Sequence, residues 1–91
     1  MGASVDRSAA IRVKVLFFGR LKEVAGIGEE SVEVETGARI EDLFGRFANS
    51  KPELARYRSS LVASRNQEFA PWDAVLESGD EVAFLPPVSG G

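Results

Sequence analysis

The chain has 91 residues, of which 44% are hydrophobic and 27% charged, and its formal net charge is -3. This length and composition fit one globular domain. The sequence contains neither cysteine nor histidine, which excludes disulfides, thiol nucleophiles, imidazole bases, and thiolate or imidazole metal ligands. The eleven lysines and arginines are scattered along the chain, a pattern that argues against nucleic-acid binding.

The chain divides into three parts by composition. Residues 1–10 are small and polar, and they predict a disordered N-terminal leader that is not a secretory signal. Residues 11–85 are expected to form one domain, and residues 86–91 a flexible reactive tail. Because no stretch approaches the roughly 20 consecutive apolar residues of a membrane span, we expect a cytoplasmic protein with no membrane contact.

The first half of the domain predicts two strands and two helices. Ile11–Phe18 begins with alternating apolar and polar residues, typical of a strand, and its outer face turns apolar at the end. A short helix is predicted over residues 20–25, and an antiparallel partner strand over residues 30–35. Apolar residues then recur from Ile40 to Ala48 at the spacing of an amphipathic helix, which Pro52 prevents from continuing far.

The second half predicts short strands. After an irregular or short helical segment at Leu54 and Tyr57, strands are expected over residues 61–64, 69–70 and 81–85. A hairpin, one crossing helix and returning strands make an α+β roll. The expected fold is therefore a mixed four- to five-stranded sheet with one main helix packed on one face.

The last six residues, PPVSGG, have the properties of a reactive arm. The two prolines favour an extended exit from the sheet, and Val88 offers an apolar anchor. Gly90 and Gly91 have no Cβ atoms, so they can pass through a channel too narrow for other residues. Another protein can then capture and activate the Gly91 carboxylate. The same glycines also fit an inert, frayed end.

Three stretches carry a resemblance to a known family. They are Val13–Glu23 (VKVLFFGRLKE), Asn66–Gln67 and Gly79–Gly91 (GDEVAFLPPVSGG). With them the sequence resembles the molybdopterin synthase small subunit, a ubiquitin-like β-grasp family, over essentially residues 12–91. Two positions depart from the family pattern: Arg65 stands where an apolar residue is usual, and Arg39 where a helix-capping Thr or Ser is frequent.

The resemblance implies a sulfur carrier that is a co-substrate and leaves catalysis to its partners. Gly91 would be adenylated by an E1-like adenylyltransferase that uses ATP, and a sulfur donor protein would supply the sulfur of a thiocarboxylate. No cofactor is expected to stay bound. Val88, Ser89 and Gly90 would thread the tail into the large synthase subunit, within a heterotetramer of two small and two large subunits. There the sulfur would pass to cyclic pyranopterin monophosphate (precursor Z), forming the dithiolene of molybdopterin.

Strand parity predicts a partner-binding surface. Leu16, Phe18 and Leu85 lie on the strand faces opposite the helix-facing residues, where a solitary protein should be polar. Apolar side chains there indicate a protein partner. The resemblance implies that the large subunit contacts Phe18, Phe69 and Leu85. The alternative is a second small core under a loop, roofed by Trp72.

Other functions remain open at this point. A carrier of the same chemistry for thiamine thiazole is one, although the run from Phe84 to Pro87 argues against it. A ubiquitin-like modifier that forms isopeptide bonds with lysines is a second, and a binding module with an inert tail is a third. Arg20, Lys22 and Glu23 are candidates for docking the activating enzyme.

Overall fold

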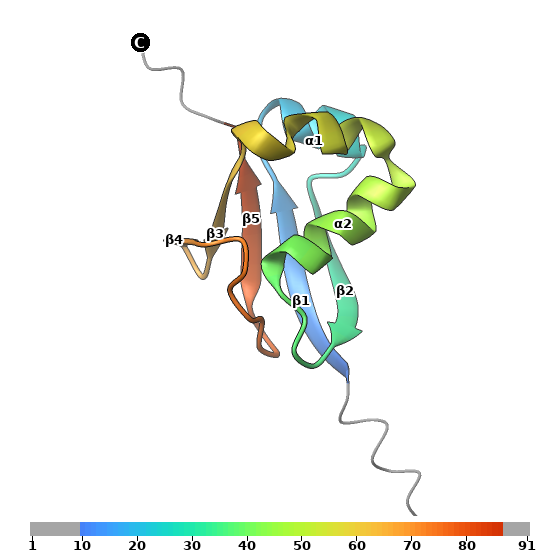
Figure 1. Ribbon diagram of the computed structural model, residues 1–91. Coiled ribbons are helices and arrows are strands. Elements are labelled where there is room, and N and C mark those ends of the chain that lie inside the picture. The colour runs from blue at the N-terminus through green and yellow to red at the C-terminus, as the bar shows by residue number, and fades with distance from the viewer. Residues whose placement is uncertain (1–9, 87–91) are drawn as a thin grey trace, which may run out of the picture.

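The computed structural model describes residues 10–86, in which five strands form one mixed sheet and the helices lie on one side of it and across one end (Figure 1). The elements are β1 (Ala10–Phe17), α1 (Arg20–Ala25), β2 (Glu29–Glu35), α2 (Ile40–Ser50), the 3-10 helix η2 (Pro52–Ser60), β3 (Val62–Arg65), β4 (Glu68–Ala70) and β5 (Glu81–Leu85). The predicted α+β roll is confirmed, with five strands in its sheet. The predicted strand boundaries are displaced by one residue at β1, β2, β3 and β4.

The sheet has the order β2-β1-β5-β3-β4. β1 and β5 run parallel, whereas β1–β2, β5–β3 and β3–β4 are antiparallel. The last strand of the chain is therefore inserted at the centre of the sheet. As a result, Pro86, which follows β5, leaves from the middle of the sheet and not from its edge (Figure 1).

The first strand begins one residue earlier than predicted. Ala10 belongs to β1 because it pairs with Glu35 of β2, so the predicted leader is one residue too long. The remainder of that leader lies outside the described residues. β1 ends at Phe17, although the amide of Phe18 still donates a hydrogen bond to the carbonyl of Phe84 at 3.3 Å.

The N-terminus of α2 is satisfied without a Ser or Thr at its first position. The backbone amide of Arg39 donates to the Asp42 carboxylate at 2.9 Å. The next two amides, of Ile40 and Glu41, donate to carbonyls of the connection between β4 and β5 at 3.0 and 2.9 Å. These bonds satisfy donors that a helix start leaves unpaired, so the departure at Arg39 costs α2 little.

A tight turn joins β3 to β4. Asn66 and Gln67 both have positive φ, 53° and 73°, as a two-residue hairpin turn of type I′ requires. The Asn66 side chain ties the turn to the start of β5: its Oδ1 accepts the amide of Glu81 at 3.0 Å, and its Nδ2 donates to Asp80 at 2.9 Å. These bonds hold Asn66, which is not a glycine, in an unfavourable conformation.

Arg65, the second departure from the family pattern, has a structural role. Its Nη1 donates to the carbonyl of Val75 at 2.7 Å, and its Nε lies 4.0 Å from the Asp80 carboxylate. The side chain therefore links β3 to the connection between β4 and β5. A polar anchor replaces the apolar packing that the family pattern led us to expect.

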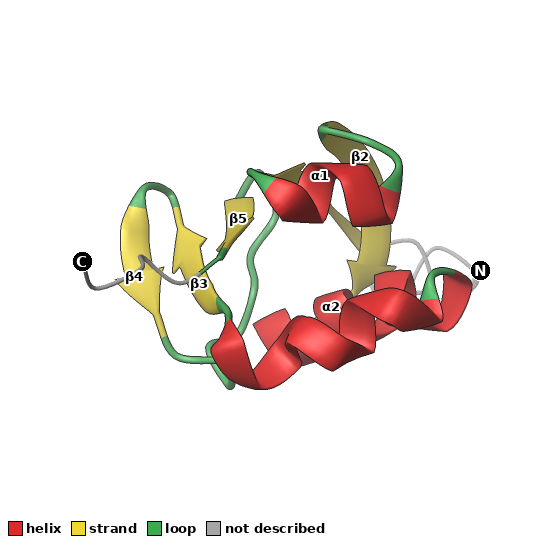
Figure 2. Ribbon diagram, turned by 90° about the horizontal axis from the view of Figure 1, so that it is seen from above, coloured by secondary structure: helices red, strands yellow, loops and turns green. Residues whose placement is uncertain are grey.

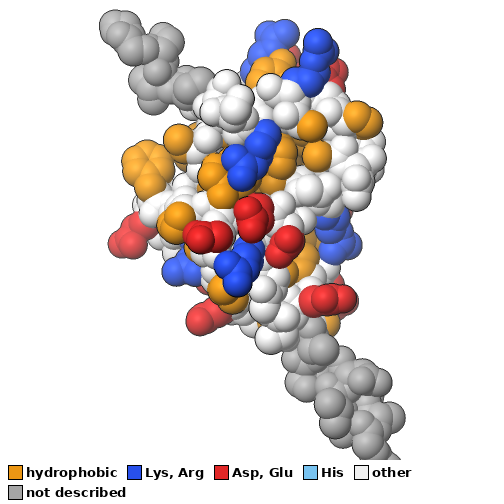
Figure 3. Space-filling view, in the orientation of Figure 1, with side chains coloured by type: hydrophobic (Ala, Val, Ile, Leu, Met, Phe, Trp, Pro, Cys, Tyr) orange, Lys and Arg blue, Asp and Glu red, His pale blue; other side chains and the backbone are white. Residues whose placement is uncertain are grey.

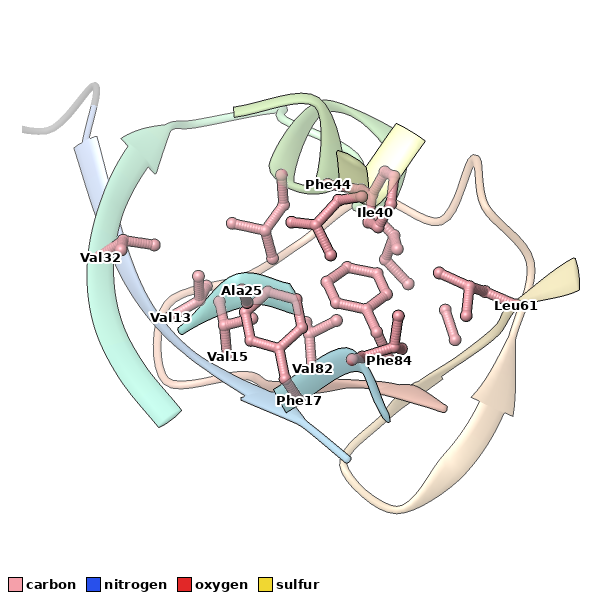
Figure 4. Close-up of a cluster of buried hydrophobic side chains, with 14 of the residues drawn as sticks. Val13, Val15, Phe17, Ala25, Val32, Ile40, Phe44, Leu61, Val82 and Phe84 are labelled. Atoms are coloured by element: carbon pink, nitrogen blue, oxygen red, sulfur yellow. The ribbon is translucent and has the colours of Figure 1, made fainter. Parts of the chain in front are cut away.

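The core fills the space between the sheet and the helices (Figure 4). Phe84 of β5 is fully buried, with ring centroids 5.7 Å from Phe17, 5.1 Å from Phe44 and 5.7 Å from Trp72. The guanidinium of Arg58, from η2, lies 3.6 Å above the Trp72 ring. Seen from above, α2 and η2 form a layer along one side of the sheet, and α1 lies across its end (Figure 2).

Candidate functional site

The predicted reactive tail begins at the centre of the sheet. Val88, Ser89, Gly90 and Gly91 lie outside the described residues, so the structure shows the base of the tail only. That base is Pro86, which follows β5 directly.

Gly19 packs tightly against the base of the tail. A Cβ atom at Gly19 would lie 3.2 Å from Cγ of Pro86, closer than nine in ten real Cβ contacts, and Gly19 has a φ of +59°. Both the space and the backbone conformation therefore favour glycine here. Pro86 therefore lies beside Gly19, the residue that precedes α1, at the base of the predicted tail.

One face of the sheet, here called the open face, is turned away from α2 and η2. The strand register brings side chains from distant segments into one row on this face. The row crosses four strands and consists of Leu16, Ala83, Ser64 and Phe69. A second row, nearer the tail, pairs Leu85 with Val62, and Phe18 continues the alternation of β1 beside them.

Together these rows form an apolar patch around the exit of the tail. We define the apolar patch as Leu16, Phe18, Val62, Phe69, Ala83 and Leu85. Phe69 is 81% exposed on the edge strand β4, Phe18 is 44% exposed, and Leu16 and Leu85 are half-buried. All four side chains predicted to bind a partner thus lie on one face. A hydrophobic group projects at the β4 edge in the space-filling view (Figure 3).

Val62 was missed by the sequence reasoning. It is 41% exposed and lies beside Leu85 in the patch. The signal was available in the alternation of its strand, because Leu61 and Ala63 are both buried in the core and Val62 between them must face outward. Ala83 alternates with the buried Val82 and Phe84 and so faces outward, but its neighbours leave it only 7% exposed.

The alternative of a second core roofed by Trp72 is wrong. Trp72 stacks on Phe84 at an interplanar angle of 16°, and it packs edge-on against Phe44. It therefore belongs to the core on the helix side of the sheet. A shallow groove of 340 Å³ adjoins the patch, lined by Leu61, Val62, Ala63, Phe69, Ala70, Pro71 and Trp72.

The half of the open face farther from the tail is charged. Arg12 and Glu33 form an ion pair at 3.3 Å, and Lys14 and Glu29 form another at 3.7 Å. Their side chains are 45–63% exposed, and exposed pairs of this kind contribute little stability. The open face is thus divided into an apolar half beside the tail and a charged half away from it.

The charged residues proposed to dock an activating enzyme lie on α1, which follows Gly19. Arg20 and Lys22 are exposed, and Glu23 lies on the same helix. Arg20 Nε donates to the hydroxyl of Tyr57 at 3.2 Å, and this hydrogen bond raises the pKa of Arg20 above its ordinary value. Arg20 therefore stays charged at any physiological pH.

The described residues offer few groups for catalysis. Within residues 10–86, no three His, Cys, Asp or Glu side chains lie close enough together to hold a metal ion. The buried carboxylate of Asp80 accepts hydrogen bonds from Asn66 and from the amide of Glu77, so its role is structural. No helix in this part of the chain has the length and apolar character needed to span a membrane.

Known proteins match this chain over most of its length. Residues 15–91 match the model of the ThiS family. The molybdopterin synthase sulfur carrier subunit of Chlamydomonas reinhardtii is 41% identical over 83 residues, which cover 89% of this chain and all of that protein.

Solved structures share the fold. Small archaeal modifier protein 1 of Haloferax volcanii is 28% identical with a TM-score of 0.76, over 86% of this chain and 99% of that one. A protein–protein complex of subunits 1 and 2 of the molybdopterin-converting factor from Helicobacter pylori contains a chain that is 26% identical. Its TM-score is 0.60, over 89% of this chain and 100% of that one.

Proposed function

The chain belongs to the ThiS family, and from this premise we propose that it is the sulfur-carrier subunit of a molybdopterin synthase. The observation that carries the proposal is the identity of 41% with a molybdopterin synthase sulfur carrier subunit along that protein's whole length. The matching family model extends to residue 91 and so includes the tail.

The proposed reaction takes place on the Gly91 carboxylate. An E1-like adenylyltransferase uses ATP to convert this carboxylate into an acyl-adenylate, and a sulfur donor protein supplies the sulfur that makes it a thiocarboxylate. The described residues support this division of labour, because they contain no nucleophilic thiol or imidazole and no cluster of metal-binding side chains. The chain itself binds no permanent cofactor, and we place the reaction in the cytoplasm.

The loaded tail then delivers its sulfur in the active site of the large subunit. Gly90 and Gly91 pass through the narrowest part of the channel, with Ser89 and Val88 behind them. The sulfur is transferred to cyclic pyranopterin monophosphate, and the catalytic side chains belong to the large subunit. We propose the heterotetramer of two small and two large subunits as the working assembly.

The large subunit covers the apolar patch in this proposal. Apolar side chains surround the point at which the tail leaves the sheet, so a partner that receives the tail must lie against them. The solved complex of subunits 1 and 2 from Helicobacter pylori supports a partner of this kind. Phe18, Phe69, Leu16 and Leu85 form the contact, and Val62 joins them.

Protein modification is the second candidate. It is favoured by the likeness to small archaeal modifier protein 1. In that case an amine of a lysine would attack the activated Gly91 carboxylate and form an isopeptide bond. Both candidates require the same activated tail, so only its products distinguish them.

Two measurements test the proposal. Mass spectrometry of the protein from its native host should find a C-terminal thiocarboxylate, whereas conjugates to other proteins would support the modifier. The thiocarboxylate form, mixed with the cognate large subunit, should convert precursor Z to molybdopterin. Deletion of Gly91 should abolish this conversion and leave the circular dichroism spectrum unchanged. Failure of the loaded protein to convert precursor Z would refute the assignment.

A further inference from the structure

Ser64 occupies the centre of the open face. It is paired with Ala83 on one side and with Phe69 on the other, and Val62 precedes it on the same face of β3. Only 8% of Ser64 is exposed. A polar side chain thus lies among the apolar patch at the place that a docked partner would cover most completely.

The Ser64 hydroxyl has no hydrogen-bond partner within residues 10–86. The other buried polar residue, Asp80, differs in this respect, because its carboxylate is bonded to Asn66 and to the amide of Glu77. No side-chain nitrogen or oxygen of the described residues is both buried and unpaired, so the Ser64 oxygen still reaches solvent and can be hydrogen-bonded by water in the free protein. Ser64 faces away from the core, so only groups on the open face can pair with it.

Docking of a partner removes the Ser64 hydroxyl from water. When the apolar patch is covered, water is expelled, and an unpaired hydroxyl would then oppose binding. An apolar contact alone also fixes no orientation, since the hydrophobic effect is non-directional. A hydrogen bond from the partner to Ser64 would offset the cost of removing water from the hydroxyl. It would also fix the orientation of the partner on the patch.

We propose that the Ser64 hydroxyl forms a hydrogen bond with a polar group of the large subunit and sets the register in which the apolar patch docks. This inference rests on the proposed function, since it takes the large subunit as the partner. It makes Ser64 a positioning residue, because it acts on the tail through the orientation of the two proteins. The Gly91 chemistry itself does not involve it.

The test compares three variants for binding to the purified cognate large subunit by calorimetry. Ser64→Ala should weaken binding about tenfold, equivalent to about 1.4 kcal/mol, because the group of the partner loses its hydrogen bond. Ser31→Ala is the matched control: Ser31 is an exposed serine on the same face, opposite Lys14 in the charged half, and its replacement should change affinity less than twofold. Phe18→Lys reports on the docking face itself.

The outcomes separate the inference from the proposed function. If Ser64→Ala binds as tightly as the unmodified protein, or more tightly, while Phe18→Lys binds weakly, the role of Ser64 is refuted and the docking face stands. If Phe18→Lys also binds normally, the role of Ser64 and the proposed docking face are both refuted. A crystal structure of the complex gives a second measurement that needs no variant. The Ser64 Oγ must lie within about 3.2 Å of a polar atom of the large subunit, and an apolar environment there would overturn the inference.

Discussion

The two faces of the sheet are built from the same strands but differ in what covers them. On the helix side, Val15, Phe17 and Phe84 are at most 2% exposed, and their rings and methyl groups pack against α2 and Trp72. On the open face, Phe18 and Val62 remain more than two-fifths exposed. A sheet with one covered face needs only one apolar face for folding. Folding therefore does not require the second set of apolar side chains, and we propose that they bind the partner.

The open face is itself divided along its strands. Its apolar half surrounds the base of the tail at Pro86, whereas the ion pairs of Arg12 and Lys14 lie toward the opposite end. The division places the apolar patch beside the base of the tail, where the proposed partner would receive it. The two faces, and the two halves of the open face, should therefore respond differently to substitution.

Loss of a core ring should have the largest effect. Phe84→Ala removes the ring that contacts Phe17, Phe44 and Trp72, and it should lower the free energy of unfolding by about 3–5 kcal/mol. Phe18→Ala, the same change on the open face, should cost less than about 1 kcal/mol. Urea denaturation measures both. Equal losses would show that the open face contributes to the fold as much as the covered face does.

A charge in the apolar patch should have the next largest effect, on binding. Phe18→Lys places an ammonium group in the proposed interface, where a docked large subunit would exclude water, and affinity should fall on the order of 100-fold. The free energy of unfolding should stay nearly constant, because the lysine is solvated in the free protein. Isothermal titration calorimetry and urea denaturation of the same sample separate the two quantities. Unchanged affinity would remove the open face from the proposed interface.

Much of this arrangement could be predicted from local sequence patterns. The alternation of Ile11–Phe18 and the spacing from Ile40 to Ala48 identified β1 and α2, because side-chain periodicity depends only on backbone geometry. The same alternation placed Leu16 and Phe18 on the open face. The parity of β3 would have added Val62, had it been applied to that short strand.

Other features depend on contacts between distant segments and carry no local signal. The insertion of β5 between β1 and β3 is one, since the register of Leu16 with Ala83 joins residues far apart in the chain. The hydrogen bonds that begin α2 are another, because the acceptors lie in the connection between β4 and β5. The site of Trp72 was ambiguous for the same reason: an aromatic residue in a loop can cover either face of a sheet.

A substitution at Gly19, beside the base of the tail, should have a smaller effect on the free energy of unfolding. Gly19→Ala forces a Cβ atom against Pro86 at a φ of +59°, and it should lower the free energy of unfolding by about 1–2 kcal/mol. Gly45→Ala is the matched control, since Gly45 lies inside α2 with nothing near its missing Cβ. It should stabilise the protein by roughly 0.5–1 kcal/mol. A stabilising Gly19→Ala would mean that the contact with Pro86 does not constrain the tail base.

The smallest effect is expected in the charged half of the open face. Arg12→Ala breaks the exposed ion pair with Glu33 and should change the free energy of unfolding by less than about 0.5 kcal/mol. Affinity for the large subunit should change less than about twofold, since the proposed contact is confined to the apolar half. A tenfold loss of affinity would contradict this boundary, because the interface would then extend over the full length of the strands. The charged half would in that case belong to the contact surface and would not mark its limit.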